Sequence, residues 1–121
     1  MSPQQGFTLI ELMVVLALIA ILATFAVPRL INLNTHATQN ATDSVAASLA
    51  TVSASNFAQR VANSSAGSAI SNCTNIGQLL SGGLPTGYTI TSLAITAGSS
   101  VRCMLNGSNS TTAGFVGMGI S

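Results

Sequence analysis

Charged side chains are nearly absent from this chain of 121 residues. Only 4% of the residues are charged and the formal net charge is +1, whereas about 25% of the residues of an ordinary soluble domain are charged. The chain has no Lys, and Arg29, Arg60 and Arg102 lie far apart in the sequence. Because nucleic-acid binding requires clustered basic side chains, the composition predicts no nucleic-acid partner.

Side chains that perform catalysis or bind metals are also scarce. His36 is the single His, and Glu11 and Asp43 are the only acids. Neither acid is spaced to act with His36, so a nucleophile, a base and an orienting group cannot be assembled, and a tetrahedral zinc site lacks ligands. We therefore expect no enzymatic activity, no metal and no cofactor, and we interpret His36 as a solvated or packed helix residue.

Cysteine is limited to Cys73 and Cys103. The two residues lack the Cys-x-x-Cys spacing of redox motifs and have no neighbours at metal-binding spacing. They predict one structural disulfide and hence an oxidising, extracytoplasmic location, the alternative being two buried thiols. A bridge that closes a loop of about 30 residues stabilises a small domain by roughly 3 to 4 kcal/mol in the chain-entropy model.

One long apolar run is present near the N-terminus. From Phe7 to Val27 the only ionisable side chain is Glu11, and as a helix this run is roughly 30 Å long, the thickness of a bilayer's hydrocarbon core. A cleaved secretory signal is the alternative, but the run is too long, contains an acid and continues to Pro28 without a convincing cleavage site. The segment predicts a retained membrane anchor, in which the Glu11 carboxylate must lie at the membrane interface or find a cationic partner.

The residues after the anchor show first a helical and then a strand pattern. Pro28 is expected to kink or open the helix, which then continues to about residues 63–67 with an apolar stripe of Ala37, Ala41, Val45, Leu49 and Val52. A short helical turn is expected at residues 76–80 and strands at 88–95, 101–105 and 115–120, with a bulge or a break near residues 91–92. The predicted fold class is α+β, a long N-terminal helix packed on a small antiparallel sheet.

The run GFTLIELMVVLALIAILATFAVP resembles the N-terminal signature of type IV pilins and the related pseudopilins. The resemblance implies that residues 1–6 are a leader, that a prepilin peptidase cuts between Gly6 and Phe7, and that Phe7 becomes N-methylated. Residues 7–28 would form the transmembrane and filament-core helix, with the characteristic Glu at Glu11 and the family's Pro at Pro28. Residues 29–121 would form the rest of the helix and the globular pilin domain.

The same resemblance implies a partner for the carboxylate. On assembly, the helices leave the lipid and pack together, and the amine of Phe7 on an adjacent subunit pairs with Glu11, because an unpaired buried charge costs several kcal/mol. This pair would also set the axial register of each new subunit. The side chains expected in the filament core are Phe7, Leu9, Leu12, Leu16, Ile19 and Phe25.

Residues 73–80 and 84–88, together with Cys103, look like the globular part of the mannose-sensitive haemagglutinin group of type IVa pilins. The leader departs from the family, because Ser2-Pro3-Gln4-Gln5 contains no Lys or Arg. The expected function is that of a structural subunit of a bacterial type IV pilus. The chain would lie in the inner membrane before assembly, where the prepilin peptidase and the pilus assembly machinery bind it. It would then form a homo-oligomeric helical filament on the cell surface for adhesion, with motility left open.

Two other functions fit part of the pattern. A pseudopilin of a type II secretion system has the same N-terminus, but major pseudopilins commonly hold calcium in an acidic C-terminal loop and lack a disulfide, whereas this chain has no acid after Asp43. A monomeric single-pass anchor that displays a small binding domain predicts no cleavage at Gly6 and no requirement for Glu11.

Overall fold

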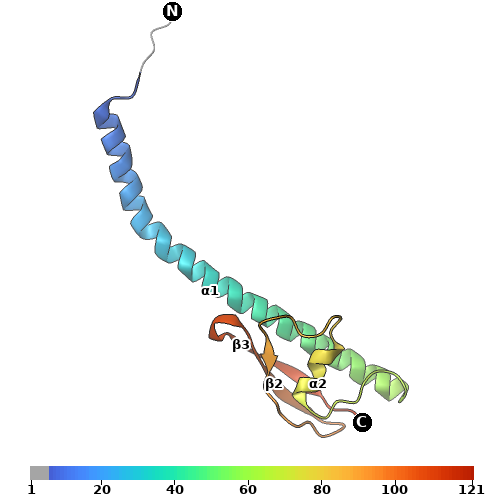
Figure 1. Ribbon diagram of the computed structural model, residues 1–121. Coiled ribbons are helices and arrows are strands. Elements are labelled where there is room, and N and C mark those ends of the chain that lie inside the picture. The colour runs from blue at the N-terminus through green and yellow to red at the C-terminus, as the bar shows by residue number, and fades with distance from the viewer. Residues whose placement is uncertain (1–5) are drawn as a thin grey trace, which may run out of the picture. The chain divides into compact units, whose positions relative to one another are not determined.

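The computed structural model describes residues 6–121, apart from the side chain of Ile31. The expected leader, residues 1–6, therefore lies outside the described residues except for Gly6. The chain forms two compact units, Met1–His36 and Ala37–Ser121, which are described separately. The elements in order are α1 (Leu9–Ala62), α2 (Cys73–Ile76), η1 (Gly77–Leu79), β1 (Thr89–Ile90), β2 (Ser100–Asn106), η2 (Ser108–Ser110) and β3 (Thr112–Met118) (Figure 1).

These elements confirm the predicted α+β fold, with one long N-terminal helix and a small antiparallel sheet. α1 is helical on both sides of Pro28, even though a proline has no N–H to donate to the preceding turn. The helix ends at Ala62, next to the polar and glycine-containing stretch in which its end was expected. The predicted kink at Pro28 stays a prediction.

The sheet has the strand order β1-β2-β3, and all neighbours are antiparallel. β1 is much shorter than predicted, because only Thr89 and Ile90 pair with β2. The following segment leaves the sheet, and Ala94 instead forms an isolated bridge with Asn72. The expected break near residues 91–92 is therefore where pairing with β2 ends. The prediction of one strand over 88–95 is wrong because Leu93 and Ile95 bond through their backbones to Cys73 and Ser71 and not to β2.

The buried face of α1 in the second unit also differs from the prediction. Ala37 and Ala41 are exposed, and Val45 and Val52 are only half-buried. The buried positions are Thr42, Ala46, Leu49, Ser53 and Asn56, which still follow the three-to-four spacing of a helix face. The prediction counted only apolar side chains and therefore placed the stripe about one residue out of phase.

The buried polar side chains of α1 all have hydrogen-bond partners. The hydroxyls of Thr42 and Thr111 lie 2.7 Å apart, and Ser53 Oγ accepts a 2.9 Å bond from the backbone N–H of Met118. Asn56 is bonded twice to the backbone of Ser68, donating at 2.8 Å and accepting at 2.7 Å. Small polar residues therefore let the end of β3 and two loops approach the helix closely without leaving a buried polar group unsatisfied.

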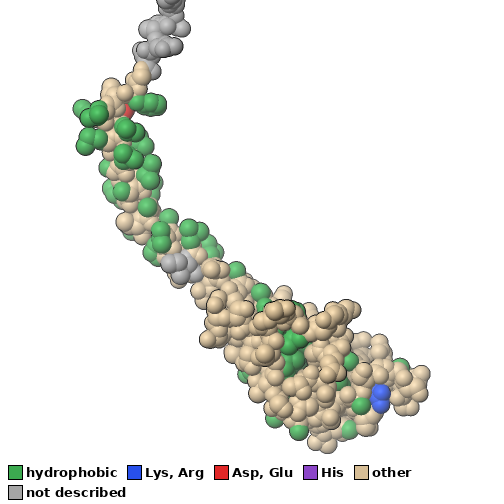
Figure 2. Space-filling view, viewed as in Figure 1, with side chains coloured by type: hydrophobic (Ala, Val, Ile, Leu, Met, Phe, Trp, Pro, Cys, Tyr) green, Lys and Arg blue, Asp and Glu red, His purple; other side chains and the backbone are tan. Residues whose placement is uncertain are grey.

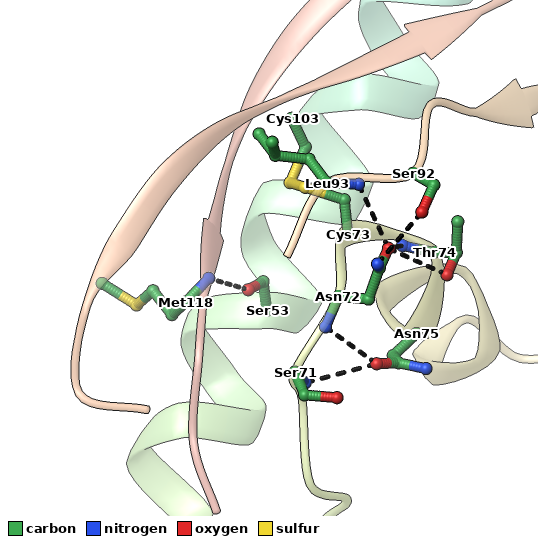
Figure 3. Close-up of a disulfide and its surroundings, with 10 residues drawn as sticks. All are labelled: Ser53, Ser71, Asn72, Cys73, Thr74, Asn75, Ser92, Leu93, Cys103 and Met118. Carbon is green, nitrogen blue, oxygen red and sulfur yellow. Dashed lines mark hydrogen bonds between the residues drawn. A yellow bond between two sulfur atoms is a disulfide. The ribbon is translucent and has the colours of Figure 1, made fainter. Parts of the chain in front are cut away.

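The core of the second unit surrounds a disulfide between Cys73 and Cys103, which confirms the predicted pair (Figure 3). Both cysteines are fully buried. Asn72 fixes the start of α2 beside this bridge, because its Oδ1 accepts the backbone N–H groups of Thr74 and Leu93 at 3.1 and 3.3 Å. The apolar side chains buried around the bridge are Ala46, Leu49, Ile70, Ile76, Ile95, Leu105 and Phe115.

Candidate functional site

The start of α1 is built by Thr8 and Glu11. Thr8 Oγ1 accepts the backbone N–H of Glu11, and Glu11 Oε2 accepts both the backbone N–H and the hydroxyl of Thr8, each at 3.3 Å. This reciprocal pair is a capping box, which satisfies backbone donors that the first turn of a helix otherwise leaves unpaired. The carboxylate also lies where the helix dipole favours negative charge.

Phe7 and Leu12 complete this helix start. They stand immediately before the cap and at the fourth helical position, the two positions that a hydrophobic staple joins, and they line one shallow cavity together with Glu11 and Val15. The ring of Phe7 is nonetheless 91% exposed. The cap therefore holds an acid and a large apolar side chain together at the end of the helix.

The N-terminal part of α1 exposes apolar side chains on every side. Its most apolar 18-residue window has a mean hydropathy of 2.7, and none of that window is buried. Figure 2 shows hydrophobic side chains gathered along this part of the helix. α1 is thus long and apolar enough to cross a membrane. All six side chains predicted for a filament core are exposed in the single chain, namely Phe7, Leu9, Leu12, Leu16, Ile19 and Phe25.

The predicted cleavage point lies outside the helix. Gly6, Phe7 and Thr8 precede the first helical residue and are exposed, so the Gly6–Phe7 peptide bond is accessible. A Cβ atom added to Gly6 would meet nothing within 4 Å. The described part of the chain therefore does not itself require glycine here, and a requirement for Gly6 would come from whatever recognises the segment.

The other predicted site residues do not join this cluster. Pro28 lies inside α1, and Cys73 and Cys103 belong to the core of the second unit. Across residues 6–121 there is no group of three or more His, Cys, Asp or Glu side chains that could hold a metal ion. Sequence reasoning missed Thr8, although the pattern Thr-x-x-Glu before an apolar run is a readable signal of a capping box.

Comparison with known families agrees with the position of this cluster. A family model described as the prokaryotic N-terminal methylation motif matches residues 1–27. No curated protein and no solved structure matches the chain. The motif covers the capping box, the predicted cleavage point and the whole apolar run of residues 7–27, and it indicates a precursor of the type IV pilin or pseudopilin kind.

Proposed function

We propose that this chain is a structural subunit of a bacterial type IV pilus, which polymerises through the N-terminal part of α1 into a surface filament for adhesion. The observation that carries the proposal is the position of Glu11, a lone carboxylate at the head of a helix whose N-terminal part exposes its apolar side chains. An apolar surface of this kind must be covered by lipid before assembly and by packed helices after assembly.

The capping box leaves room for an intersubunit partner. Both bonds from Thr8 go to Oε2 of Glu11, and Oε1 accepts no hydrogen bond from the described residues. Cleavage after Gly6 would create an amine on Phe7, and the amine of a neighbouring subunit could then bind Oε1 while Oε2 keeps the cap. The pair would satisfy both charges in the filament core, where either one alone is strongly unfavourable.

Two features favour a pilus subunit over a type II secretion pseudopilin. The second unit is closed by the Cys73–Cys103 bridge, and the chain has no acid after Asp43 with which to build an acidic calcium loop. We assign the subunit to the type IVa class and, within it, to the mannose-sensitive haemagglutinin group. This assignment rests on the resemblance of residues 73–80 and 84–88 and of Cys103.

The proposed partners follow from this role. A prepilin peptidase would remove residues 1–6 and methylate Phe7, the assembly machinery would draw the subunit from the inner membrane, and other copies of the chain would form the filament. We propose no catalytic activity, cofactor or nucleic-acid partner, because the subunit contributes binding energy between helices.

Mass spectrometry of the N-terminus tests this function directly. Material sheared from intact cells should contain a chain that begins at N-methylated Phe7 and sediments as large filaments. Gly6→Val is the matched control, because position 6 has open space for a Cβ and the rest of the fold is expected to persist. This variant should stay in the membrane fraction with residues 1–6 attached. A wild-type chain that begins at Met1 and occurs only in membranes would overturn the proposal in favour of a monomeric anchor.

A further inference from the structure

A groove of about 580 Å³ lies between α1 and the edge strand β3 within the unit Ala37–Ser121. Its helix side is lined by small side chains, and its strand side is lined by residues 112–116 of β3. Asp43 and Arg102 also line it. The small side chains of α1 that line the groove are Ala46, Ala47 and Ala50.

The strand side of this groove presents unpaired backbone groups. Thr112 O accepts a bond from Gln39 on α1, and Met118 N–H donates to Ser53 on α1. The backbone hydrogen-bonding groups of both residues therefore point away from β2. Because alternate residues of a strand point the same way, the N–H and C=O groups of Gly114 and Val116 also point toward the groove. None of the described residues is hydrogen-bonded to them there, so in the single chain water must satisfy them.

The charges of this unit are concentrated at the groove. The unit contains three charged side chains, and one of them, Arg60, is bonded to the backbone oxygens of Ser121 and Ala66 at 3.1 and 3.5 Å. Arg102 lies across Gly114 so closely that a Cβ added there would come 2.6 Å from its Nη2. Within residues 6–121, the side chain of Arg102 has no hydrogen-bond or ion-pair partner, and the side chain of Asp43 is bonded only to Gln39.

Asp43 and Arg102 lie at about the same level along the groove. The helix from Gln39 to Ser53 is about 21 Å long, and β3 from Thr112 to Met118 is about 20 Å long. Gln39 is bonded to Thr112 at one end and Ser53 to Met118 at the other, so the helix and the strand run alongside each other. Gly114 stands about one third of the way along, opposite the helical turn that contains Asp43. The groove therefore holds a cation and an anion at one height without an ion pair between them.

We propose that this groove is a self-association surface, on which a second copy of the chain docks its own groove so that Arg102 of each copy pairs with Asp43 of the other. A groove that carries both signs at one level is self-complementary about a two-fold axis parallel to the C-terminal part of α1. The small side chains and the flat Gly114 allow close approach, and the unpaired backbone groups can accept polar side chains of the partner copy. This contact goes beyond the proposed function, because it needs neither cleavage at Gly6 nor the charge pair at Glu11.

Charge reversal provides the test, with native mass spectrometry of the full chain released from detergent micelles as the readout. Arg102→Glu gives a groove with two negative charges and Asp43→Arg a groove with two positive charges, so each variant alone should dimerise at least about tenfold more weakly than the wild type. An equimolar mixture should regain dimers, and these should be heterodimers, which the masses of the two variants distinguish. Both variants are made in the Gly6→Val background, which keeps filament assembly out of the measurement.

Each result decides for or against the groove. Loss of dimers in both single variants, with recovery only as heterodimers in the mixture, supports the pairing of Arg102 with Asp43. Dimers that persist in the single variants would show that the apolar helix or another surface joins the copies, and they would overturn the proposal. A monomeric wild type at 100 µM, or a mixture that stays monomeric, overturns it as well. Arg60→Glu is the control for net charge and should dimerise like the wild type.

Discussion

Breaking the Cys73–Cys103 bridge should strongly destabilise the unit Ala37–Ser121. The cysteines are 30 residues apart, so the chain-entropy model gives a loss of about 3.6 kcal/mol at 25 °C. A unit of this size has a free energy of unfolding of about 4 to 13 kcal/mol. The loss corresponds to a fall in the midpoint of thermal unfolding of about 15 to 30 °C. The unit should therefore lose between about a quarter and nearly all of its free energy of unfolding.

The single Tyr of the chain provides the assay. The chain has no Trp, and Tyr88 packs half-buried against the core of the second unit, so intrinsic fluorescence reports this unit even when the apolar helix stays in a micelle. The oxidised full chain is compared with chain refolded under a reductant, which keeps both sulfur atoms in place, and with the double variant Cys73→Ala/Cys103→Ala. A reduced chain that unfolds within about 3 °C of the oxidised one would refute the loop-entropy reasoning.

Four other substitutions test the cap and the core. Glu11→Gln keeps a capping side chain but removes the charge. The membrane-inserted subunit should therefore persist, while the amount of filament sheared from cells falls at least about a hundredfold. Thr8→Ala costs the helix start about 1 kcal/mol and should reduce the amount of filament far less. Gly117→Ala places a methyl group 2.7 Å from the disulfide sulfur of Cys103 and should destabilise the second unit by about 1 to 3 kcal/mol in urea unfolding followed by tyrosine fluorescence. Leu49→Ala, at a fully buried position, should cost about 2 to 5 kcal/mol in the same measurement.

The regular parts of the fold were readable from the sequence. The long helix, its end near residue 62 and the antiparallel pair β2 and β3 follow from local patterns. β3 (Thr112–Met118) nevertheless begins and ends earlier than the strand predicted over residues 115–120. The buried face of α1 could not be predicted from the sequence, because Thr42, Ser53 and Asn56 are buried with hydrogen bonds to residues far away in the chain. Hydrophobic periodicity cannot predict the burial of a polar side chain whose hydrogen-bond partner lies elsewhere in the chain. The early end of β1 has the same origin, since the segment after Ile90 pairs with the region around Asn72.

The candidate site could be predicted from the sequence only in part, for a similar reason. Glu11 and the apolar run stand out because they are chemically unusual together, and the Cys73–Cys103 pair was the only disulfide possible. The groove that holds Asp43 and Arg102 could not be found by sequence reasoning, because the two residues are 59 positions apart and meet only through the packing of β3 beside α1. Thr8 could have been found, since its capping role depends only on a residue three positions away.

The small number of charges makes the position of each one informative. On an ordinary domain, most charged side chains keep the surface solvated, and their individual positions carry little meaning. This chain has five Asp, Glu and Arg side chains. Glu11 caps α1, Arg60 binds backbone oxygens, Asp43 and Arg102 line one groove, and Arg29 follows the apolar run beside Pro28. A surface with so little charge is suited to close contact with other protein surfaces, since few ions need to be desolvated when copies pack together. The two charges at the groove are then the residues best able to select which surface of another copy makes that contact.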